Sequence, residues 1–293
     1  MKPARLILAI ALFFLTSCAG TGSQPVPPTR VSAYIQNKGS DTLVNLALAW
    51  AERYQVEHPD ISISVTGGGS GTGIAALINR TVDIANASRA MTDGEISQAK
   101  ANGITPVKFV VSRDAIAVVV NPENPVRRLT LQQISDIYSG KISNWRELGG
   151  DNRPIVRLSR ETNSGTHVYF LQTVLRLGDP KNTTLFSTDT LLLPSSEVII
   201  NEVRQNPNAI GYDGLGYIPP DLANSVVAVA HDASGPYVMP NIKTVNDNSY
   251  PVARDLYMYT AGQPSGAIKD YLDWILSPEA QQIVAELGFV PIK

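Results

Sequence analysis

The stretch ISISVTGGGSGTGIAALINR, residues 61–80, decides the fold class of this chain. Apolar and polar residues alternate over 61–65, which is the period of a half-buried strand, and the run breaks at three consecutive glycines, 67–69. Apolar residues then recur at helical spacing over 74–78. The stretch therefore predicts a strand, a flexible turn and a helix that begins beside the turn.

The same alternation of strands and helices continues on both sides of this stretch. The spacing predicts a helix over 43–54 that stops before Pro59, and a buried strand over 114–120 that Asn121-Pro122 ends. Two helices close the chain, over 267–276 and from Pro278 toward residue 288, and Ser277 caps the second. This pattern predicts an α/β fold with mostly parallel sheets, whose ligands bind at the carboxyl ends of the strands.

The N-terminal segment indicates the compartment. Lys2 and Arg5 precede an apolar run over 6–15, and Leu-Thr-Ser-Cys follows at 15–18. This is the pattern of a lipoprotein export signal, and the run is shorter than the roughly 20 residues of a retained membrane helix, the alternative interpretation. We predict a signal peptide over 1–17, lipidation of Cys18, and a flexible tether over 18–30 that is rich in small residues and proline.

Composition excludes several classes of function. The net charge is −2 and no basic tract follows the signal peptide, which argues against nucleic acid or an anionic membrane surface as a partner. Cys18 is the only cysteine, so neither an internal disulfide nor a multi-thiolate metal site is possible; an incidental or buried cysteine is the alternative to lipidation. We expect no cofactor and no metal, and we expect the protein to act as a monomer.

Small residues recur at three predicted helix starts, in the turns Gly-Ser-Asp-Thr at 39–42, Ser-Gly-Thr-Gly at 70–73 and Ser-Gly-Thr at 164–166. Unpaired backbone N–H groups and the helix dipole stabilise an anion at such a position, and hydroxyl groups add donors. For any one turn taken alone, ordinary N-capping is the better explanation, because Ser, Thr and Asp are the common cap residues. The threefold recurrence favours an oxyanion site.

Two arginines lie beside these turns in the sequence, Arg89 after Asn-Ala-Ser and Arg160 four residues before Ser164. A guanidinium holds two oxygens at once, which suits phosphate or carboxylate. The alternative for each is an ordinary surface arginine. Lys141 and the Arg127-Arg128 pair stand in polar stretches, and we assign them no ligand role.

Several motifs together resemble the periplasmic phosphate-binding protein family. They are the turn at 39–42, VTGGGSGTGIAALINRTVDIANASR (65–89), DAIAVVVNPENP (114–125), LTLQQISDIYSGKISNW (129–145), SRETNSGT (159–166), NAIGYDGLGY (208–217), YPVARDLYMYT (250–260) and LGFVPIK (287–293). The resemblance implies the type II periplasmic-binding-protein fold, in which two α/β lobes are joined by two crossing strands and close on one phosphate. It also implies delivery of that phosphate to the permease of an ABC transporter.

The resemblance carries over to individual positions. It implies phosphate contacts from one lobe at Ser40, Thr42, Ser70, Gly71, Ser88 and Arg89, and from the other lobe at Arg160, Ser164, Gly165 and Thr166. The best-studied members of the family have an aspartate where this chain has Arg89, so another carboxylate must accept a proton from the ligand and reject sulfate. Our candidate is Asp41, which is equally explained as a helix cap, and Asp83 is the second choice.

The crossing strands are expected over 114–120 and within 225–230. Lobe one would then take residues 31–117 and 226–293, and lobe two would take residues 118–225. Two alternatives remain: a phosphate sensor or adhesin with the same fold, or a phosphatase or other hydrolase that uses Ser70 or Ser164. Neither serine stands in G-x-S-x-G, and we interpret the histidines, at positions 58, 167 and 231, as surface residues, so we expect no enzyme.

Overall fold

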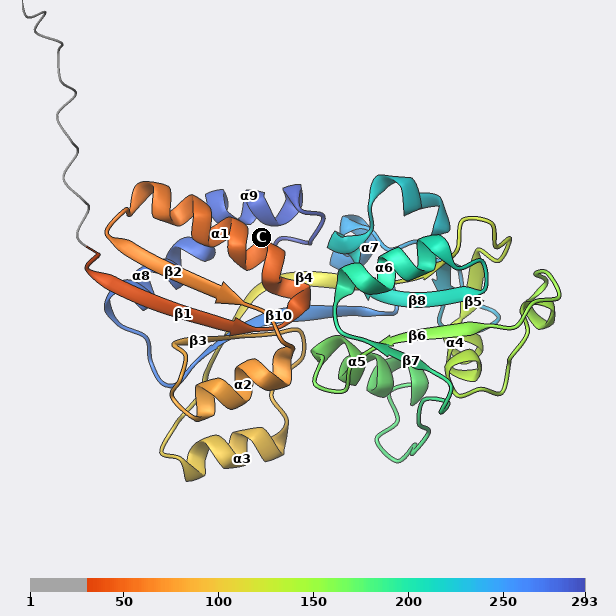
Figure 1. Ribbon diagram of the computed structural model, residues 1–293, viewed down its shortest axis with the longest axis horizontal. Helices are drawn as coiled ribbons and strands as arrows, with labels where there is room; N and C mark the ends of the chain where they lie inside the picture. The colour runs from red at the N-terminus through yellow and green to blue at the C-terminus, as the bar shows by residue number, and fades with distance from the viewer. Residues whose placement is uncertain (1–30, 293) are drawn as a thin grey trace, which may run out of the picture. The chain divides into compact units, whose positions relative to one another are not determined.

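One mixed sheet organises the molecule, in the strand order β2-β1-β3-β10-β4-β8-β6-β7 (Figure 1). The computed structural model describes residues 31–292. The strands of this sheet are β1 (Ala33–Gly39), β2 (Ile61–Thr66), β3 (Ile84–Ala87), β4 (Val107–Val120), β6 (Val156–Arg160), β7 (Leu191–Leu193), β8 (Ala209–Gly214) and β10 (Ala253–Thr260). A second, two-stranded sheet pairs β5 (Arg128–Thr130) with β9 (Ala228–Ala230).

The strand directions divide the large sheet into two parallel groups. β1 pairs in parallel with β2 and β3 at one end, and β6 pairs in parallel with β7 and β8 at the other. Between the groups, β10 is antiparallel to β3 and β4, and β4 is antiparallel to β8. Two long central strands therefore connect two parallel βαβ units.

Helices cover both groups of strands, and the helices that the sequence predicted are among them. The helices are α1 (Asp41–Glu57), α2 (Ser70–Ile78), α3 (Asp93–Ala101), α4 (Leu131–Tyr138), α5 (Gly165–Phe170), α6 (Ser196–Gln205), α7 (Ile242–Asn246), α8 (Gly266–Ile275) and α9 (Pro278–Glu286). Helix α1 buries the apolar stripe expected from its spacing, including Leu43, Leu46 and Trp50. The Ser277 side chain caps α9 by accepting from the backbone N–H of Ala280, as predicted.

The buried apolar core is also divided along the sheet. Two clusters draw their members from residues 35–111 and 256–289, and two others draw theirs from residues 115–252 together with Val290. The change from one group of clusters to the other falls within β4, between Val111 and Ala115, and at the start of β10, between Val252 and Leu256. β4 and β10 therefore run through both halves of the core.

This placement corrects one expectation. The second crossing strand was expected within 225–230, but those residues form β9 and its approach, and β9 pairs with β5 in the small sheet. β10 runs beside β4 instead, over the pairings from Ala253↔Ala115 to Thr260↔Val107. β9 is short, apolar and fully buried, whereas β10 spans eight residues and alternates buried with half-buried positions, but neither pattern shows which strand is its partner. The pairing partner decides which one crosses.

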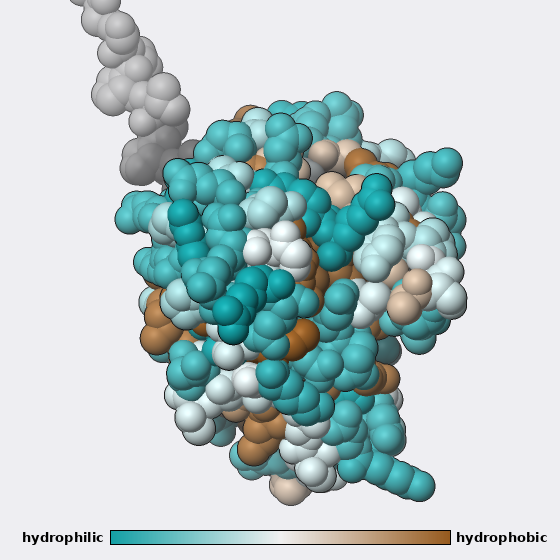
Figure 2. Space-filling view, turned by 90° about the vertical axis from the view of Figure 1, so that its right-hand side faces the viewer, coloured by the Kyte–Doolittle hydropathy of each residue, from teal (hydrophilic) through white to brown (hydrophobic). Residues whose placement is uncertain are grey.

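The predicted signal peptide, the tether and Cys18 lie outside the described residues. Within residues 31–292, no helix combines the length and the apolar character that crossing a membrane requires. Figure 2 views the end of the molecule that carries β5 and α4, where the surface is mostly hydrophilic and apolar side chains stand singly or in small groups. Such scattered apolar groups are ordinary on a folded surface.

Candidate anion-binding site

The carboxyl ends of parallel strands from both halves of the sheet face a common region. β1 ends at Gly39 and leads into α1, and β3 ends at Ala87 and leads to Ser88. In the other half, β6 ends at Arg160 and a short turn leads into α5. The three small-residue turns all stand at helix starts, as the sequence predicts, because Ser40 precedes α1, Ser70 begins α2 and Ser164 precedes α5.

Hydroxyl groups from separate parts of the chain meet at this point. The Thr42 and Thr166 hydroxyl oxygens are 2.8 Å apart, although 124 positions separate the residues in the sequence. The Ser70 hydroxyl accepts from the Ser88 backbone N–H at 3.0 Å and lies 3.3 Å from the Ser88 hydroxyl. All four residues are buried, and we call them the hydroxyl cluster. The cluster draws on α1, α2, the end of β3 and α5.

Glycines allow the two halves to approach closely here. A Cβ atom on Gly165 would lie 2.3 Å from the Ser70 hydroxyl oxygen and 2.6 Å from that of Ser88. Gly71 donates its backbone N–H to the carbonyl oxygen of Asn163 at 3.0 Å, and a Cβ on Gly71 would lie 3.3 Å from the same oxygen. The contact at Gly165 therefore requires a residue without a side chain, and a side chain at Gly71 would require its neighbour to shift by a few tenths of an ångström.

The two serines that flank the cluster hold the backbone in place. The Ser164 side chain caps α5 by accepting from the Thr166 N–H at 3.2 Å. Ser40 is 2% exposed, and its backbone N–H donates to the carbonyl oxygen of Asn86, while its side chain makes no cap hydrogen bond to α1. All the hydroxyl and glycine positions that the sequence nominated are therefore brought into one buried neighbourhood.

Arg254 of β10 is the charged residue that touches the hydroxyl cluster, and the sequence interpretation missed it. Its Nη2 donates to the Thr166 hydroxyl at 3.0 Å and lies 3.5 Å from the Thr42 hydroxyl, and its Nη1 donates to the Ser88 carbonyl oxygen at 3.0 Å. Nη2 also pairs with Asp114 at 2.9 Å. A signal was available, because Arg254 shares a strand face with the buried Leu256 and Met258.

Arg160 reaches the start of α1 rather than the hydroxyl cluster. Its Nη2 donates to the Asp41 carboxylate at 2.6 Å and to the Pro194 carbonyl oxygen at 2.9 Å, and its Nη1 donates to the Ser196 hydroxyl at 3.0 Å. The side chain is 1% exposed. Arg160 is thus a buried arginine that links the two halves of the sheet through Asp41, and the surface alternative is wrong.

Arg89 is engaged by a different carboxylate. Its two terminal nitrogens each lie 2.7 Å from an oxygen of Glu95, and Nη1 also donates to its neighbour Ala90. Burial opposes ionisation of Glu95, but the hydrogen bonds from Arg89 and Thr92 outweigh it and lower the pKa of that carboxyl. Arg89 is near the second turn, since its Nη2 lies 3.9 Å from where a Cβ on Gly71 would be.

The two carboxylates nominated from the sequence are placed differently. Asp41 stands at the site, where it accepts from Arg160 and from the Gly68 N–H at 2.9 Å. Asp83 accepts from the Gln36 N–H at 2.8 Å, in an exposed position on the way into β3. Two further carboxyls, Asp114 and Asp213, are fully buried at the site. Burial raises the pKa of each, against the opposing effect of the neighbouring arginine.

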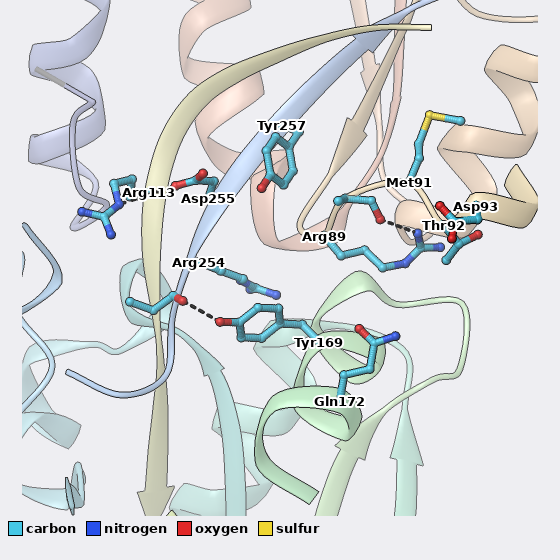
Figure 3. A pocket seen from close by; sticks show the side chains of 12 residues that line it. Arg89, Met91, Thr92, Asp93, Arg113, Tyr169, Gln172, Arg254, Asp255 and Tyr257 are labelled. Carbon is cyan, nitrogen blue, oxygen red and sulfur yellow. Dashed lines mark hydrogen bonds and ion pairs between the residues drawn. The ribbon is translucent and has the colours of Figure 1, made fainter. Parts of the chain in front are cut away.

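A pocket of about 620 Å³ adjoins the cluster (Figure 3). Tyr169 and Gln172 line it from the α5 side, and the segment after β3 and strand β10 line it from the other half. Arg254 belongs both to this pocket and to the hydroxyl cluster. The full lining is Arg89, Ala90, Met91, Thr92, Asp93, Arg113, Tyr169, Gln172, Ala253, Arg254, Asp255 and Tyr257.

His167 corrects the interpretation of the histidines as surface residues. It is 6% exposed, its Nδ1 lies 3.0 Å from the Ser159 hydroxyl, and its ring stacks on Phe186. Burial lowers its pKa. Its hydrogen-bonding partner is thus neither Ser164 nor Ser70, the serines considered for a hydrolase. His231 is exposed as expected, and His58 stacks on Tyr54.

Comparisons with known proteins agree on one family. The family model described as PBP superfamily domain matches residues 24–279. The chain is 31% identical to the phosphate-binding protein PstS of Pseudomonas aeruginosa, over 100% of this chain and 96% of that protein, and 29% identical to PstS of Bacillus subtilis, over 98% and 92%.

A solved structure supports the same family. The structure is similar to that of a phosphate ABC transporter substrate-binding protein from Clostridium perfringens, described as having bound phosphate. The two share a TM-score of 0.77 and 32% sequence identity, over 89% of this chain and 100% of that one.

Proposed function

Because this chain belongs to the PBP superfamily and, within it, to the PstS phosphate-binding proteins, we propose that it captures inorganic phosphate and delivers it to the permease of an ABC transporter. The observation that carries the proposal is the hydroxyl cluster. Two hydroxyl groups from helix starts in opposite halves of the sheet lie 2.8 Å apart beside the Arg254 guanidinium. Neutral donors, helix N-termini and a buried arginine together suit an oxyanion.

The residues proposed to contact phosphate come from both halves. In the first half they are Ser40, Asp41, Thr42, Ser70, Gly71, Ser88 and Arg89, and in the second they are Arg160, Ser164, Gly165 and Thr166; we add Arg254 to this set. Inside a water-excluded cleft each hydrogen bond to the anion is stronger than in solvent. Asp41 remains our proposed acceptor for a proton of the ligand, with Arg160 holding it in position.

The binding motion follows from the two central strands. We propose that the lobes divide where the core clusters change, within β4 and at the start of β10, which moves the second boundary from residue 226 to about residue 253. Phosphate would dock on one lobe, and its contacts to the other would favour closure. The hydroxyls of Thr42 and Thr166, which contact each other directly, would turn to the ligand.

Calorimetric titration of phosphate-stripped protein tests the function. We expect heat and saturation with phosphate and none with sulfate. If Asp41 accepts the ligand proton, Asp41→Asn should reduce the preference for phosphate over sulfate more than it reduces stability. Wild-type protein that binds no phosphate would refute the function, and an unchanged preference in Asp41→Asn would remove Asp41 from its role.

The place where the protein acts in the cell is the subject of a separate proposal. We propose that the protein acts outside the cytoplasm and is held at a membrane by lipid on Cys18, because an export signal precedes this residue. Mass spectrometry of the mature N-terminus should find diacylglyceryl and acyl groups there. Cys18→Ser should release the protein from the membrane fraction, and a variant that stays membrane-bound would contradict the anchor.

A further inference from the structure

Five charged side chains lie buried where the strand ends meet. The guanidinium groups of Arg160 and Arg254 are 1% and 2% exposed. The carboxyls of Asp114 and Asp213 are fully buried, and that of Asp41 is 16% exposed. With all five ionised, three negative charges stand against two positive ones before any anionic ligand arrives. Uncompensated charge is costly in a medium of low dielectric constant.

Two of the three carboxyls each pair closely with a guanidinium group, and the third has no guanidinium of residues 31–292 within hydrogen-bond distance. Arg160 pairs with Asp41 at 2.6 Å, and Arg254 pairs with Asp114 at 2.9 Å. Asp213 Oδ1 accepts from the Gly214 N–H at 2.7 Å, but Oδ2 is buried without a hydrogen bond and lies 3.8 Å from Arg160 Nη1. A 3.8 Å separation is too long for a hydrogen bond.

The position of Asp213 is fixed by strand register. β6 and β8 are parallel and pair Arg157 with Ile210, so Arg160 and Asp213 end adjacent strands at the same edge of the sheet. The groups that face Asp213 from the neighbouring elements are Arg160 from β6, Ser196 from α6, Asp114 from β4, Arg254 from β10, Tyr212 beside it on β8 and Tyr217 from the segment after β8. Tyr217 in turn has the carboxyls of Glu197 and Asp41 near it.

We propose that Asp213 is the proton-binding group of this site, and that phosphate binds together with a proton on the Asp213 carboxyl. The inference rests on the proposed phosphate function and adds the proton balance to it. Entry of a phosphate anion adds negative charge beside a cluster that already has an excess of it. A proton on Oδ2 removes one of these charges and turns an unpaired acceptor into a donor.

The neighbouring groups support this assignment over the other two carboxyls. Each of those holds a direct guanidinium contact shorter than 3 Å. Burial raises the pKa of Asp213 and of Asp114 alike, so geometry distinguishes the two. The contact of Asp213 with Arg160 is the longest of the three pairs, and Oδ2 of Asp213 is buried without a hydrogen bond from the described part of the chain. The added proton in the ligand-bound site is thus expected on Asp213 rather than on Asp41 or Asp114.

Isothermal titration calorimetry in buffers of different protonation enthalpy measures how many protons the protein takes up for each phosphate it binds. Phosphate-stripped protein is titrated with phosphate at several values between about pH 6 and 9, and the buffer dependence of the heat gives the protons bound per phosphate. We compare wild type with Asp213→Asn, and with Asp136→Asn as a control, because Asp136 pairs with Lys141 and does not belong to the five charged groups. Because all the proteins receive the same ligand, the protons of phosphate itself cancel in the differences.

We expect wild type to bind about one proton per phosphate more than Asp213→Asn, and Asp136→Asn to take up as many protons as wild type. Equal proton numbers in wild type and Asp213→Asn, or a loss of uptake in Asp136→Asn as large as in Asp213→Asn, would overturn the assignment. Wild-type protein that binds no phosphate would instead refute the phosphate function on which it rests.

If Asp213→Asn does not fold, the pH dependence of phosphate binding by the wild-type protein still tests the proposal. With phosphate's own ionisation subtracted, its dissociation constant should then weaken with rising pH, by up to about tenfold per unit. A dissociation constant that does not depend on pH after this correction would overturn the inference.

Discussion

At the scale of single residues, Arg254 connects more of the site than any residue chosen from the sequence. One guanidinium contacts two hydroxyls of the cluster, a backbone carbonyl and a buried carboxylate. It therefore fixes the relative positions of α1, α5 and the end of β3. Ligand contact and structural support are combined in one side chain.

Removal of this side chain should affect binding and stability together. Arg254→Ala leaves Asp114 as an unpaired buried charge, which costs about 3–5 kcal/mol in comparable cases. We expect a large loss of phosphate affinity and a lower unfolding free energy, measured by calorimetry and urea titration. The double variant with Asp114→Asn should recover part of the stability without recovering affinity. Wild-type affinity in Arg254→Ala would contradict the assignment.

Because of the Arg89–Glu95 pair, the free energy of unfolding should decrease at acidic pH. The pKa of Glu95 is lower in the folded protein than in the unfolded chain, so its contribution is complete above the unfolded-state value of about 4.3. The contribution is lost as the pH falls through the folded-state pKa. Urea unfolding at several acidic pH values should show a smaller acid-dependent loss in Glu95→Gln than in wild type. An identical loss in both would contradict the pairing.

Sequence reasoning reached some of these residues and not others, for physical reasons. The helix starts at Ser40, Ser70 and Ser164 follow from local chemistry, because capping residues and glycines mark them. Arg254 could have been found, since an arginine on the apolar face of a strand has to be buried with a partner. The pairing of Arg160 with Asp41 could not, because it joins residues 119 positions apart whose meeting depends on the tertiary fold.

At the scale of elements, the turns before α2 and α5 work as one unit. The start of α2 supplies Ser70 and Gly71, the segment before α5 supplies the Asn163 carbonyl, and the start of α5 supplies Gly165. The strand predicted over 114–120 lies within β4, but β4 begins earlier, at Val107. The second crossing strand was expected at β9, which pairs with β5 instead. A short, buried, apolar segment can pair in either sheet, so its sequence does not show its partner.

Gly165→Ala tests the contact between these elements. The added methyl group would lie 2.3 Å from the Ser70 hydroxyl and would force the two turns apart. We expect phosphate affinity to fall strongly while far-ultraviolet circular dichroism stays unchanged. Gly262→Ala is the matched control, because a Cβ there meets no atom within 4 Å. Equal affinity in both variants would show that the turns do not need to touch.

At the scale of the whole molecule, the two central strands determine which motions are available. β4 and β10 are the strands that run through both halves of the core, and Thr42–Thr166 and Asp41–Arg160 are contacts between those halves. A rotation about β4 and β10 would separate these contacts without breaking either core. The fold thus fits a hinge of few residues.

Small-angle scattering should detect this motion. Phosphate-stripped protein is expected to have a larger radius of gyration than the phosphate-bound form, because contacts to the ligand favour closure. Cysteines introduced at positions 163 and 72 and joined by a short bifunctional thiol cross-linker should abolish the difference, since Asn163 Nδ2 lies 3.5 Å from the Thr72 hydroxyl. An unchanged radius in the unlocked protein would argue against hinge closure.

The hydrogen bond from Gly71 to Asn163 uses only main-chain atoms. Replacing Asn163 leaves its carbonyl oxygen in place but removes the hydrogen bond from its side-chain Nδ2 to the Gly68 carbonyl oxygen. On the opposite side, Gly69 has a φ of +91°, and a Cβ there would lie 2.9 Å from the Asn163 carbonyl oxygen. A homologue is therefore expected to tolerate a change at position 163 better than any side chain at position 69.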